Sequence, residues 1–406
     1  MQINSNHDVL SKVNFLTGNA EFIEKISDIN AKVPFENSII EFLNDVSREL
    51  MSNKNAKAYS DVITFAFWIR KSSLLKLKER FEKKDGAFHI GKGVAFHIAP
   101  SNVPVNFAYS LTAGLLNGNA NIVRVPSKNF EQIALISEAF EKVLEKERYQ
   151  EFKSYVLLVR YERDKNINDL FSSVADVRVI WGGDNTIEEL RKSPLPPRST
   201  EITFADRYSI AFIDSDSYLE IENKIRVAED FYNDTFFSDQ NACTSPRIII
   251  WTGNKISEAK KIFWEEEHKT AIKKYNFQPI QGVNKLTQSC LIAVAEHGVK
   301  VENHQDNLII RVSVPEIKNN LMDYRDNSGY FYEYECDDIL KIKNLCNDKR
   351  CQTVAYIGDK KIFLPLIQSG IKGIDRIVPV GRTMDFDLIW DGYDLSSSLS
   401  RNIVLA

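Results

Sequence analysis

The sequence predicts an α/β protein built as two lobes. From residue 86 onward, apolar β-type runs alternate with amphipathic helical segments, an order that gives mostly parallel sheets covered by helices on both faces. A proline-rich link, Ser193 to Arg198, interrupts the alternation, which then resumes. The chain has 406 residues, and at roughly 150 residues per domain this length is typical of two or three domains.

The expected boundaries follow these changes of pattern. Residues 1–85 have helical periodicity and form the amino-terminal part of the first lobe. Residues 86–205 form the sheet of that lobe, and residues 206–378 form the second lobe. We expect the tail, residues 379–406, to return to the core or to an oligomer interface.

Individual elements are predicted from period and from end signals. Ser38 and Glu41 fit a capping box at the start of a helix, and Asn117-Gly118 ends another. Ser127 fits the cap of a later helix. Gly91 to Gly93 is typical of a hairpin turn between two strands. The predicted helices are 39–50, 70–84, 107–116, 128–143 and 256–274, and the predicted strands are 87–90, 94–98, 121–125, 155–159, 177–181, 210–213 and 248–251.

Composition excludes several classes of protein. Lys plus Arg is 52 and Asp plus Glu is 56, which gives a net charge of −4 and no electrostatic footprint for nucleic acid. No run approaches the ~20 apolar residues of a membrane span, and the first residues show no basic-then-apolar leader. We therefore expect a cytoplasmic protein. The five cysteines contain no C-x-x-C, so we expect neither a disulfide framework nor a metal site.

One glycine motif is misleading. Residues 86–92 match G-x-x-x-x-G-K, the start of a phosphate-binding loop, but Gly93 stands where Ser or Thr would bind Mg²⁺. The interior of the match also has the pattern of a strand. We therefore reject nucleotide triphosphate hydrolysis. The sequence contains neither H-E-x-x-H nor G-x-S-x-G, so we also expect no zinc protease or serine hydrolase.

Cys243 is the candidate for chemistry. It lies in a small and polar segment immediately before the apolar strand 248–251. A buried structural cysteine is more often surrounded by apolar residues. From the residues alone, a structural thiol and a nucleophile both remain open, with the structural thiol favoured.

The segment around Cys243 resembles the nucleophile loop of the aldehyde dehydrogenase superfamily. Gln240 precedes the cysteine by three residues and Arg247 follows it by four. Further segments resemble the superfamily in the same order: 98–104 with its proline–asparagine–proline loop, 115–123, 181–184 and Glu201. Within the superfamily, the chain is most similar to the LuxC acyl-CoA reductases of bacterial luminescence operons. That resemblance rests on 196–201 with Phe204, Arg207 and Ser209, on 239–247, on 373–381 and on 390–401, and it covers roughly residues 85–406.

The resemblance implies an aldehyde dehydrogenase-like fold, with a Rossmann-like cofactor-binding lobe and a catalytic lobe. It implies that Cys243 takes a fatty acyl group from a thioester and that a nicotinamide then reduces the acyl group to an aldehyde. The Asn102 amide and the Cys243 backbone N–H would stabilise the oxyanion. Glu201 would serve as a base or in proton transfer, although in a reductase its role is open. A turn residue and a surface carboxylate are the ordinary interpretations of Asn102 and Glu201.

The same resemblance implies a set of cofactor-binding residues. These are Ser101, Arg124, Ser127, Lys128, Gly182 and Gly183. Lys128 stands where NAD-preferring members often have Glu, so we predict NADPH (NADP) as the cofactor. The competing interpretations are a solvated helix for Lys128 and an ordinary strand–turn–helix for the glycines. The superfamily motif Glu-x-Phe-Gly-Pro has no clear counterpart in the region of residues 329–333.

The expected partners are an acyl-CoA or acyl-protein donor, an acyl-protein synthetase, and further copies of this chain in a homo-oligomer. Two other functions remain open. One is a CoA-acylating aldehyde dehydrogenase that acts on short-chain aldehydes in the opposite direction. The other is a non-catalytic scaffold for the synthetase, which retention of Cys243, Asn102 and Glu201 argues against.

Overall fold

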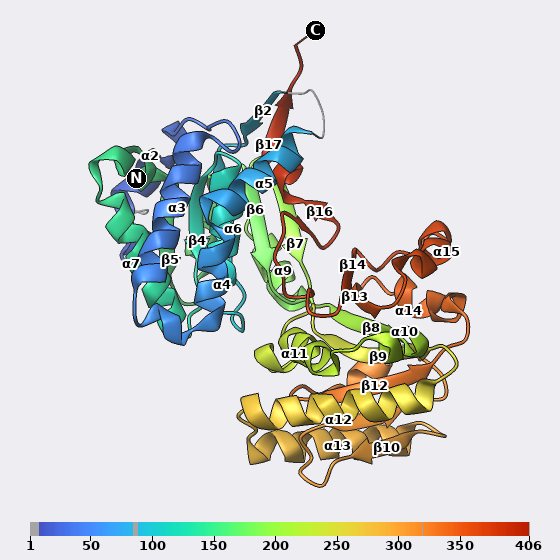
Figure 1. Ribbon diagram of the computed structural model, residues 1–406. Helices are drawn as coiled ribbons and strands as arrows, with labels where there is room; N and C mark the ends of the chain where they lie inside the picture. The colour runs from blue at the N-terminus through green and yellow to red at the C-terminus, as the bar shows by residue number, and fades with distance from the viewer. Residues whose placement is uncertain (1–7, 84–87, 319, 406) are drawn as a thin grey trace. The chain divides into compact units, whose positions relative to one another are not determined.

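The computed structural model describes residues 8–83, 88–318 and 320–405 (Figure 1). The chain divides into two compact units. The first unit contains the chain up to Ala205 and again from Asp387, and the second unit is Asp206–Phe386. The tail expected at residues 379–406 therefore divides at residue 387. The expected boundary between residues 85 and 86 lies outside the described residues.

The first unit is built around a six-stranded sheet with the strand order β1-β5-β4-β3-β6-β7. All neighbouring strands are parallel except β1, which pairs antiparallel with β5 at one edge. The six strands are β1 (Asn14–Thr17), β3 (Val94–Ile98), β4 (Ala120–Arg124), β5 (Val156–Arg160), β6 (Val177–Trp181) and β7 (Thr200–Phe204). Two small antiparallel pairs complete the unit: β2 (Phe88–Gly91) with β17 (Ser400–Ile403), and β15 (Ile389–Trp390) with β16 (Tyr393–Asp394).

Helices connect the parallel strands and cover both faces of the first sheet. His97 of β3 bonds to Ser110 of one helix, whereas the neighbouring Phe96 packs on Phe171 of another, so the two helices lie on opposite faces. The helices of this unit are α2 (Ala20–Lys25), α3 (Asn37–Ser52), α4 (Ser60–Trp68), α5 (Lys71–Glu82), α6 (Asn106–Leu116), α7 (Glu131–Leu144), α8 (Lys165–Ser173), α9 (Asp184–Arg191) and α16 (Leu395–Ser398).

The strand order of the first sheet defines where a ligand would bind. The chain runs from β3 through β4 to β5 on one side and then returns to β6 on the other side of β3. This reversal between β3 and β6 is a topological switch point. In open parallel sheets, ligands bind outside the carboxyl ends of the strands at such a point.

A buried line of polar side chains lies beneath this switch point. The Trp181 Nε1–H donates to Ser110 Oγ over 2.9 Å, and Ser110 Oγ lies 2.7 Å from His97 Nδ1. Asn121 Oδ1 lies 3.1 Å from His97 Nε2 and is an acceptor, so the Nε2 atom carries the ring proton. Burial lowers the pKa of His97 to about 4, so the ring is neutral and structural.

The second unit contains a seven-stranded sheet with the order β10-β11-β12-β9-β8-β13-β14. Only the edge pair of β10 with β11 is antiparallel among the pairings in this described sheet. The strands are β8 (Tyr208–Asp214), β9 (Pro246–Thr252), β10 (Lys300–Asn303), β11 (Ile310–Ser313), β12 (Tyr330–Glu335), β13 (Cys351–Ile357) and β14 (Arg376–Pro379). The helices are α10 (Ser215–Glu220), α11 (Lys224–Asp234), α12 (Ile256–Lys274), α13 (Pro279–Ala295), α14 (Lys343–Asn347) and α15 (Leu364–Gln368).

Each face of the second sheet has its own hydrophobic core. Alternate strand residues point to opposite faces, so Ile249 and Trp251 join the aromatic side chains of α11 and α12 in one core. Ile248 and Ile250 join Ile292 of α13 in the other. The apolar runs 210–213 of β8 and 248–251 of β9 are therefore buried on both faces of the sheet, as the sequence predicted.

The structure confirms two α/β lobes and corrects three local predictions. The predicted hairpin of 87–90 with 94–98 is wrong, because β2 pairs with β17 near the end of the chain. Ser38 does not cap its helix, since the N-cap is Glu36 and Ser38 Oγ contacts the carboxylate of Glu36. Ser127 does not cap either, because α7 begins after Phe130.

Replacement of Gly114 by alanine tests the packing of α6 against β4. An added Cβ would meet Asn121 Oδ1 at 1.8 Å, and Asn121 is held by its own hydrogen bonds to backbone carbonyls. We expect Gly114→Ala to lower the free energy of unfolding by about 1–3 kcal/mol, measured by urea titration. Gly183→Ala is the control, because its Cβ would meet no atom within 4 Å. Equal stability of the two variants would contradict the described packing.

Candidate active site

Cys243 lies in a loop at the amino edge of the second sheet. We call residues 236–245 the cysteine loop; it begins with the short helix η4 (Phe236–Ser238) and leads into β9. Asp239 and Gln240 both have a φ of 54°, in the left-handed region that costs roughly 1–2 kcal/mol for each residue with a side chain. The surrounding contacts must therefore hold the turn in place.

Gln240 supplies most of those contacts. Its side chain is fully buried, and its Nε2 atom donates to the carbonyl oxygens of Pro246 (3.1 Å) and Tyr330 (3.3 Å). Its Oε1 atom accepts from the backbone N–H groups of Gly329 (2.8 Å) and Tyr330 (3.1 Å). The amide thus uses its full hydrogen-bonding capacity to join the cysteine loop to β9 and β12.

Arg247 joins the cysteine loop to a second segment. The buried guanidinium donates to the carbonyl oxygens of Gln240 (2.5 Å) and Asp326 (2.8 Å). Burial lowers the pKa of Arg247 to about 10, and the negative charge of an ionised Cys243 is among the charges that oppose this shift. Arg247 therefore stays cationic at neutral pH and attracts a thiolate at Cys243.

Cys243 is half-buried, and its backbone is fixed by Ser209. The Ser209 hydroxyl, at the start of β8, donates to the carbonyl oxygen of Cys243 over 2.8 Å. All five cysteines lie in the described part of the chain as thiols. Cys336, Cys346 and Cys351 are buried core residues, and Cys290 is exposed on α13. Cys243 differs from these four in combining partial exposure with a polar loop and a nearby cation.

Within the second unit, two residues that precede the cysteine loop in sequence bind the segment 375–383. Arg207 forms an ion pair with Asp375, so the start of β8 is tied to the start of β14. Asp234, at the end of α11, accepts from the backbone N–H groups of Gly381 (2.6 Å) and Thr383 (3.0 Å). Burial raises the pKa of Asp234 to about 7. The segment 375–383 is therefore bound both to the start of β8 and to the end of α11.

The predicted cofactor residues lie along the carboxyl edge of the first sheet. Ser101 and Asn102 are exposed in the loop after β3, and Ser127 and Lys128 are exposed in the loop after β4. Gly182 and Gly183 separate β6 from α9, and Gly183 is the N-cap of that helix. A Cβ on Gly183 would point into open space, so packing does not require glycine there and close approach of a ligand would explain it.

A hollow of about 350 Å³ opens beside these loops. Arg124, at the end of β4, lines it and packs on the Tyr161 ring at 4.5 Å. Arg163 and Lys192 also line it, whereas Lys128 is not among the lining residues and lies over the Phe130 ring. Sequence reasoning missed Arg163 and Lys192. For Arg163 the available signal was a basic residue soon after the buried strand β5, whereas Lys192 ends helix α9 and carries no such signal.

Glu201 lies near the opposite end of β7 from this edge. Its Oε2 atom accepts from Arg178 Nε (2.9 Å) and Arg178 Nη2 (2.5 Å), and its Oε1 atom accepts from Arg191 Nε (2.7 Å). Arg178 is buried on the neighbouring strand. The structure does not bring Glu201 together with Ser101, Asn102 and the glycines. Its contacts are those of a structural ion pair, and its catalytic role stays a prediction.

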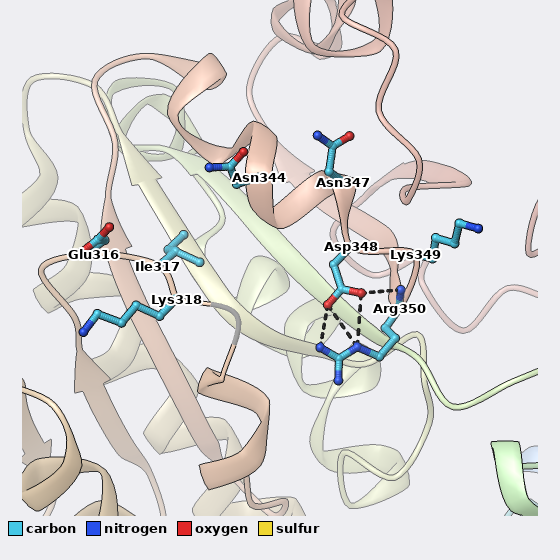
Figure 2. A pocket seen from close by; sticks show the side chains of 8 residues that line it. All are labelled: Glu316, Ile317, Lys318, Asn344, Asn347, Asp348, Lys349 and Arg350. Atoms are coloured by element: carbon cyan, nitrogen blue, oxygen red, sulfur yellow. Dashed lines mark hydrogen bonds and ion pairs between the residues drawn. The ribbon is translucent and has the colours of Figure 1, made fainter.

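A larger hollow, of about 820 Å³, opens elsewhere on the second unit. Figure 2 shows its polar lining, in which Arg350 turns back onto the carboxylate of Asp348. The carbonyl of Arg350 accepts the Tyr208 N–H, one residue before Ser209. Asp348 and Arg350 therefore neutralise each other within this hollow, and Lys318 pairs with Glu296 outside it.

Two further findings concern the described residues alone. Within residues 8–83, 88–318 and 320–405, no group of three or more His, Cys, Asp and Glu side chains could hold a metal ion. Among the helices that the structure describes, none is long and apolar enough to cross a membrane.

Solved structures with a similar fold are aldehyde dehydrogenases. Glyceraldehyde-3-phosphate dehydrogenase GapN from Methanocaldococcus jannaschii, complexed with NADP, matches with a TM-score of 0.67 and 12% identity over 94% of this chain and 92% of that one. Aldehyde dehydrogenase 21 from Physcomitrella patens, in complex with succinate, matches with a TM-score of 0.66 and 11% identity over 94% and 88%. These matches confirm the predicted fold.

Curated relatives are bacterial reductases. The long-chain acyl-protein thioester reductase of Aliivibrio fischeri is 23% identical over 296 residues, which cover 71% of this chain and 58% of the relative. The long-chain acyl-protein thioester reductase 2 of Photobacterium leiognathi is 24% identical over 299 residues, covering 71% and 59%. The chain thus spans less than two thirds of the length of either relative. The family model described as acyl-CoA reductase (LuxC) matches residues 8–401, and the chain therefore belongs to the LuxC family.

Proposed function

We propose that this protein reduces a long-chain fatty acyl thioester to a fatty aldehyde through an acyl group held on Cys243. The observation that carries the proposal is the cysteine loop, in which Gln240 and Arg247 hold a half-exposed thiol beside a buried cation. A thiolate is the reactive form of cysteine, and a thioester is its natural electrophile. The names of the bacterial relatives support a long-chain acyl substrate.

The residues of the first unit fit a dinucleotide cofactor. The hollow beside the carboxyl edge is large enough for part of such a molecule. Its lining holds four basic residues, among them Arg124 and Arg163, against the two acidic residues Asp164 and Glu189. The first turn of α9, after Gly183, offers backbone N–H groups suited to a pyrophosphate. We infer that Arg124, with Lys128 nearby in sequence, favours NADPH by pairing with the 2′-phosphate. When bound, the nicotinamide would supply hydride.

The proposed reaction has three steps on Cys243. First, the thiolate attacks the acyl carbon, the bond to the donor sulfur breaks, and the donor leaves as a thiol after taking a proton. Second, the acyl-cysteine would accept at its carbonyl carbon the hydride that a bound nicotinamide would supply, and its oxygen would become an oxyanion. Third, the oxyanion collapses, the carbon–sulfur bond breaks, and the aldehyde leaves while Cys243 returns to its thiolate.

The oxyanion of each tetrahedral intermediate needs hydrogen-bond donors. The backbone N–H of Cys243 is the proposed donor in the second unit, because Ser209 fixes the carbonyl of the same residue and so limits how its backbone can turn. The Asn102 amide remains the predicted side-chain donor. Glu201 is proposed to act structurally, through Arg178 and Arg191. With Glu201 in this structural role, no residue is assigned to activate water beside the acyl-enzyme. A reductase requires this, because water must be kept from cleaving the acyl group.

The donor and the partners are part of the proposal. The family description favours acyl-CoA, whereas the relatives' names favour an acyl-protein, which would come from an acyl-protein synthetase. We also propose that the protein forms a homo-oligomer. The alternative function is the opposite reaction, in which a short-chain aldehyde is oxidised and its acyl group is transferred to CoA.

Acylation of Cys243 is the first test. Incubation of the protein with acyl-CoAs of several chain lengths, without cofactor, should add one acyl group, and peptide mass spectrometry should find it on Cys243. Added NADPH should remove the group and release aldehyde. We expect Cys243→Ser to lose both the adduct and at least about 10³-fold of the rate, because a hydroxyl is a much weaker nucleophile at neutral pH.

Cys290→Ser is the matched control, since Cys290 is the exposed thiol outside the cysteine loop. It should keep both the adduct and the rate. An adduct that survives in Cys243→Ser, or full activity of that variant, would refute the mechanism. Activity confined to short aldehydes with CoA and an oxidised cofactor would replace it with the reverse reaction.

Arg124→Ala tests the preference for NADPH. A charge-assisted hydrogen bond contributes about 1.5–3 kcal/mol, so we expect KM for NADPH to rise roughly 10- to 100-fold while KM for NADH changes little. Steady-state kinetics with both cofactors measure the ratio. Lys128→Ala, made in parallel, should have a smaller effect because Lys128 does not line the hollow. An equal loss with NADH would show that Arg124 does not recognise the 2′-phosphate.

Glu201→Gln separates a structural ion pair from a catalytic base. The change removes the negative charge that balances the buried Arg178, so we expect the free energy of unfolding to fall by about 3 kcal/mol. Urea titration measures this loss, and kcat per folded molecule is measured alongside it. Unchanged stability together with a collapse of kcat would instead support the catalytic role predicted from the sequence.

A further inference from the structure

A buried lysine lies behind the cysteine loop. Lys285 is the one charged residue in the sequence of α13, and it is fully buried. Its ammonium group donates to the carbonyl oxygens of Leu308 (2.7 Å) and Ser328 (2.6 Å) and lies 4.6 Å from the centre of the Phe277 ring. Burying an ammonium group is costly, so its retention on an otherwise uncharged helix requires a reason.

The lysine fixes a tight turn. We call residues 326–330 the clamp turn; Ser328 and Gly329 within it have φ angles of 60° and 93°. A Cβ on Gly329 would meet the Leu308 carbonyl oxygen at 2.5 Å and the Phe236 ring at 2.6 Å. Lys285 bridges Leu308 and Ser328, and it thereby holds the start of β11 against the start of β12.

The clamp turn holds the cysteine loop. The Ser328 N–H donates to the Asp239 carbonyl (3.2 Å), and the Gly329 N–H donates to Gln240 Oε1 (2.8 Å). The Asp326 carbonyl accepts from Arg247, and Asn327 Nδ2 donates to Asn241 Oδ1 over 2.7 Å. Four consecutive residues of the clamp turn thus bond to the loop or to the arginine that follows it.

We propose that Lys285 is a positioning residue for Cys243: it fixes the clamp turn, and the clamp turn fixes the left-handed corner from which the cysteine is presented. The effect of Lys285 on turnover rests on the proposed function. Its effect on the geometry of the cysteine loop does not.

The electrostatics agree with a tether. Burial lowers the pKa of Lys285 to about 7, while the Asp326 and Asp306 carboxylates oppose the shift. A neutral amine still has two N–H groups for the two carbonyls, so the tether persists in either protonation state.

The test measures the reactivity of Cys243 apart from turnover. Native protein is treated with iodoacetamide, and the modification rates of the Cys243 and Cys290 peptides are followed by mass spectrometry. For Lys285→Met, which keeps an unbranched side chain one atom shorter and has no donor, we expect the Cys243 rate to change about tenfold and the Cys290 rate to stay within twofold. In turnover, kcat should fall about tenfold to a hundredfold while KM for NADPH stays constant.

Two further variants separate positioning from stability. Ile292→Ala loses buried packing from the same helix without removing a bond to the clamp turn, so it should lower stability and leave the Cys243 rate unchanged. Lys285→Arg keeps N–H donors and should recover part of the rate. Lys285→Gln is the milder replacement if the methionine variant does not fold.

The outcomes are distinct. Equal Cys243 reactivity and kcat in Lys285→Met and Ile292→Ala, at equal stability, would overturn the positioning role. An absence of acyl adduct on the unaltered protein would refute the proposed function, and the alkylation rates would still decide the role of Lys285.

Discussion

The candidate site of the second unit depends on the side-chain amide of Gln240, which uses all of its hydrogen-bond donors and acceptors. Two successive residues with side chains take left-handed backbone angles, which an isolated loop would not maintain. Four hydrogen bonds from one buried amide, to β9 on one side and to the start of β12 on the other, offset that cost. Glutamic acid could not replace it, because the site demands two donors and two acceptors from the same group. Gln240 closes the turn three positions before the thiol of Cys243, so its bonds to β9 and to the start of β12 fix the backbone from which the thiol is presented.

Buried charge surrounds this amide. Arg247 and Lys285 are both inside the unit, and both bind backbone carbonyl oxygens. Replacing such groups by apolar residues often gains stability, so charges that end on carbonyls are poor devices for stability alone. Buried cations are well suited to fixing loops, because one cation bonds to the carbonyl oxygens of two different segments. Each segment is thereby held in a single position relative to the other. Asp234 works in the same way with the opposite sign, since its carboxylate gathers the backbone N–H groups of Gly381 and Thr383.

The sequence was sufficient where local pattern decides the structure. The strand Val177–Trp181 and the helix Ile256–Lys274 have the bounds that their apolar pattern and charge pattern predict. It failed where the partner is distant: Phe88–Gly91 looks like half of a hairpin, but its neighbour is Ser400–Ile403, and no local signal reveals that pairing. The family resemblance was what pointed to Cys243, because the residues around it did not by themselves decide between a structural thiol and a nucleophile. Lys285 and the pairing of Glu201 with Arg178 escaped prediction for one reason, namely that both depend on which strands are neighbours.

The candidate site residues lie at different ends of the strands in the two sheets, at the carboxyl edge of the first and at the amino edge of the second. In the first unit, the loops of interest follow the strands, so the start of α9 provides N–H groups and a positive helix end for an anion. In the second unit, the cysteine loop precedes its strand, and the helix end that leads into it is the carboxyl end of α11, which is negative. α11 therefore does not stabilise a thiolate in that loop. Arg247 brings a positive charge to Cys243, and the same side chain bonds to the loop, so the position of the loop and its local charge depend on one residue.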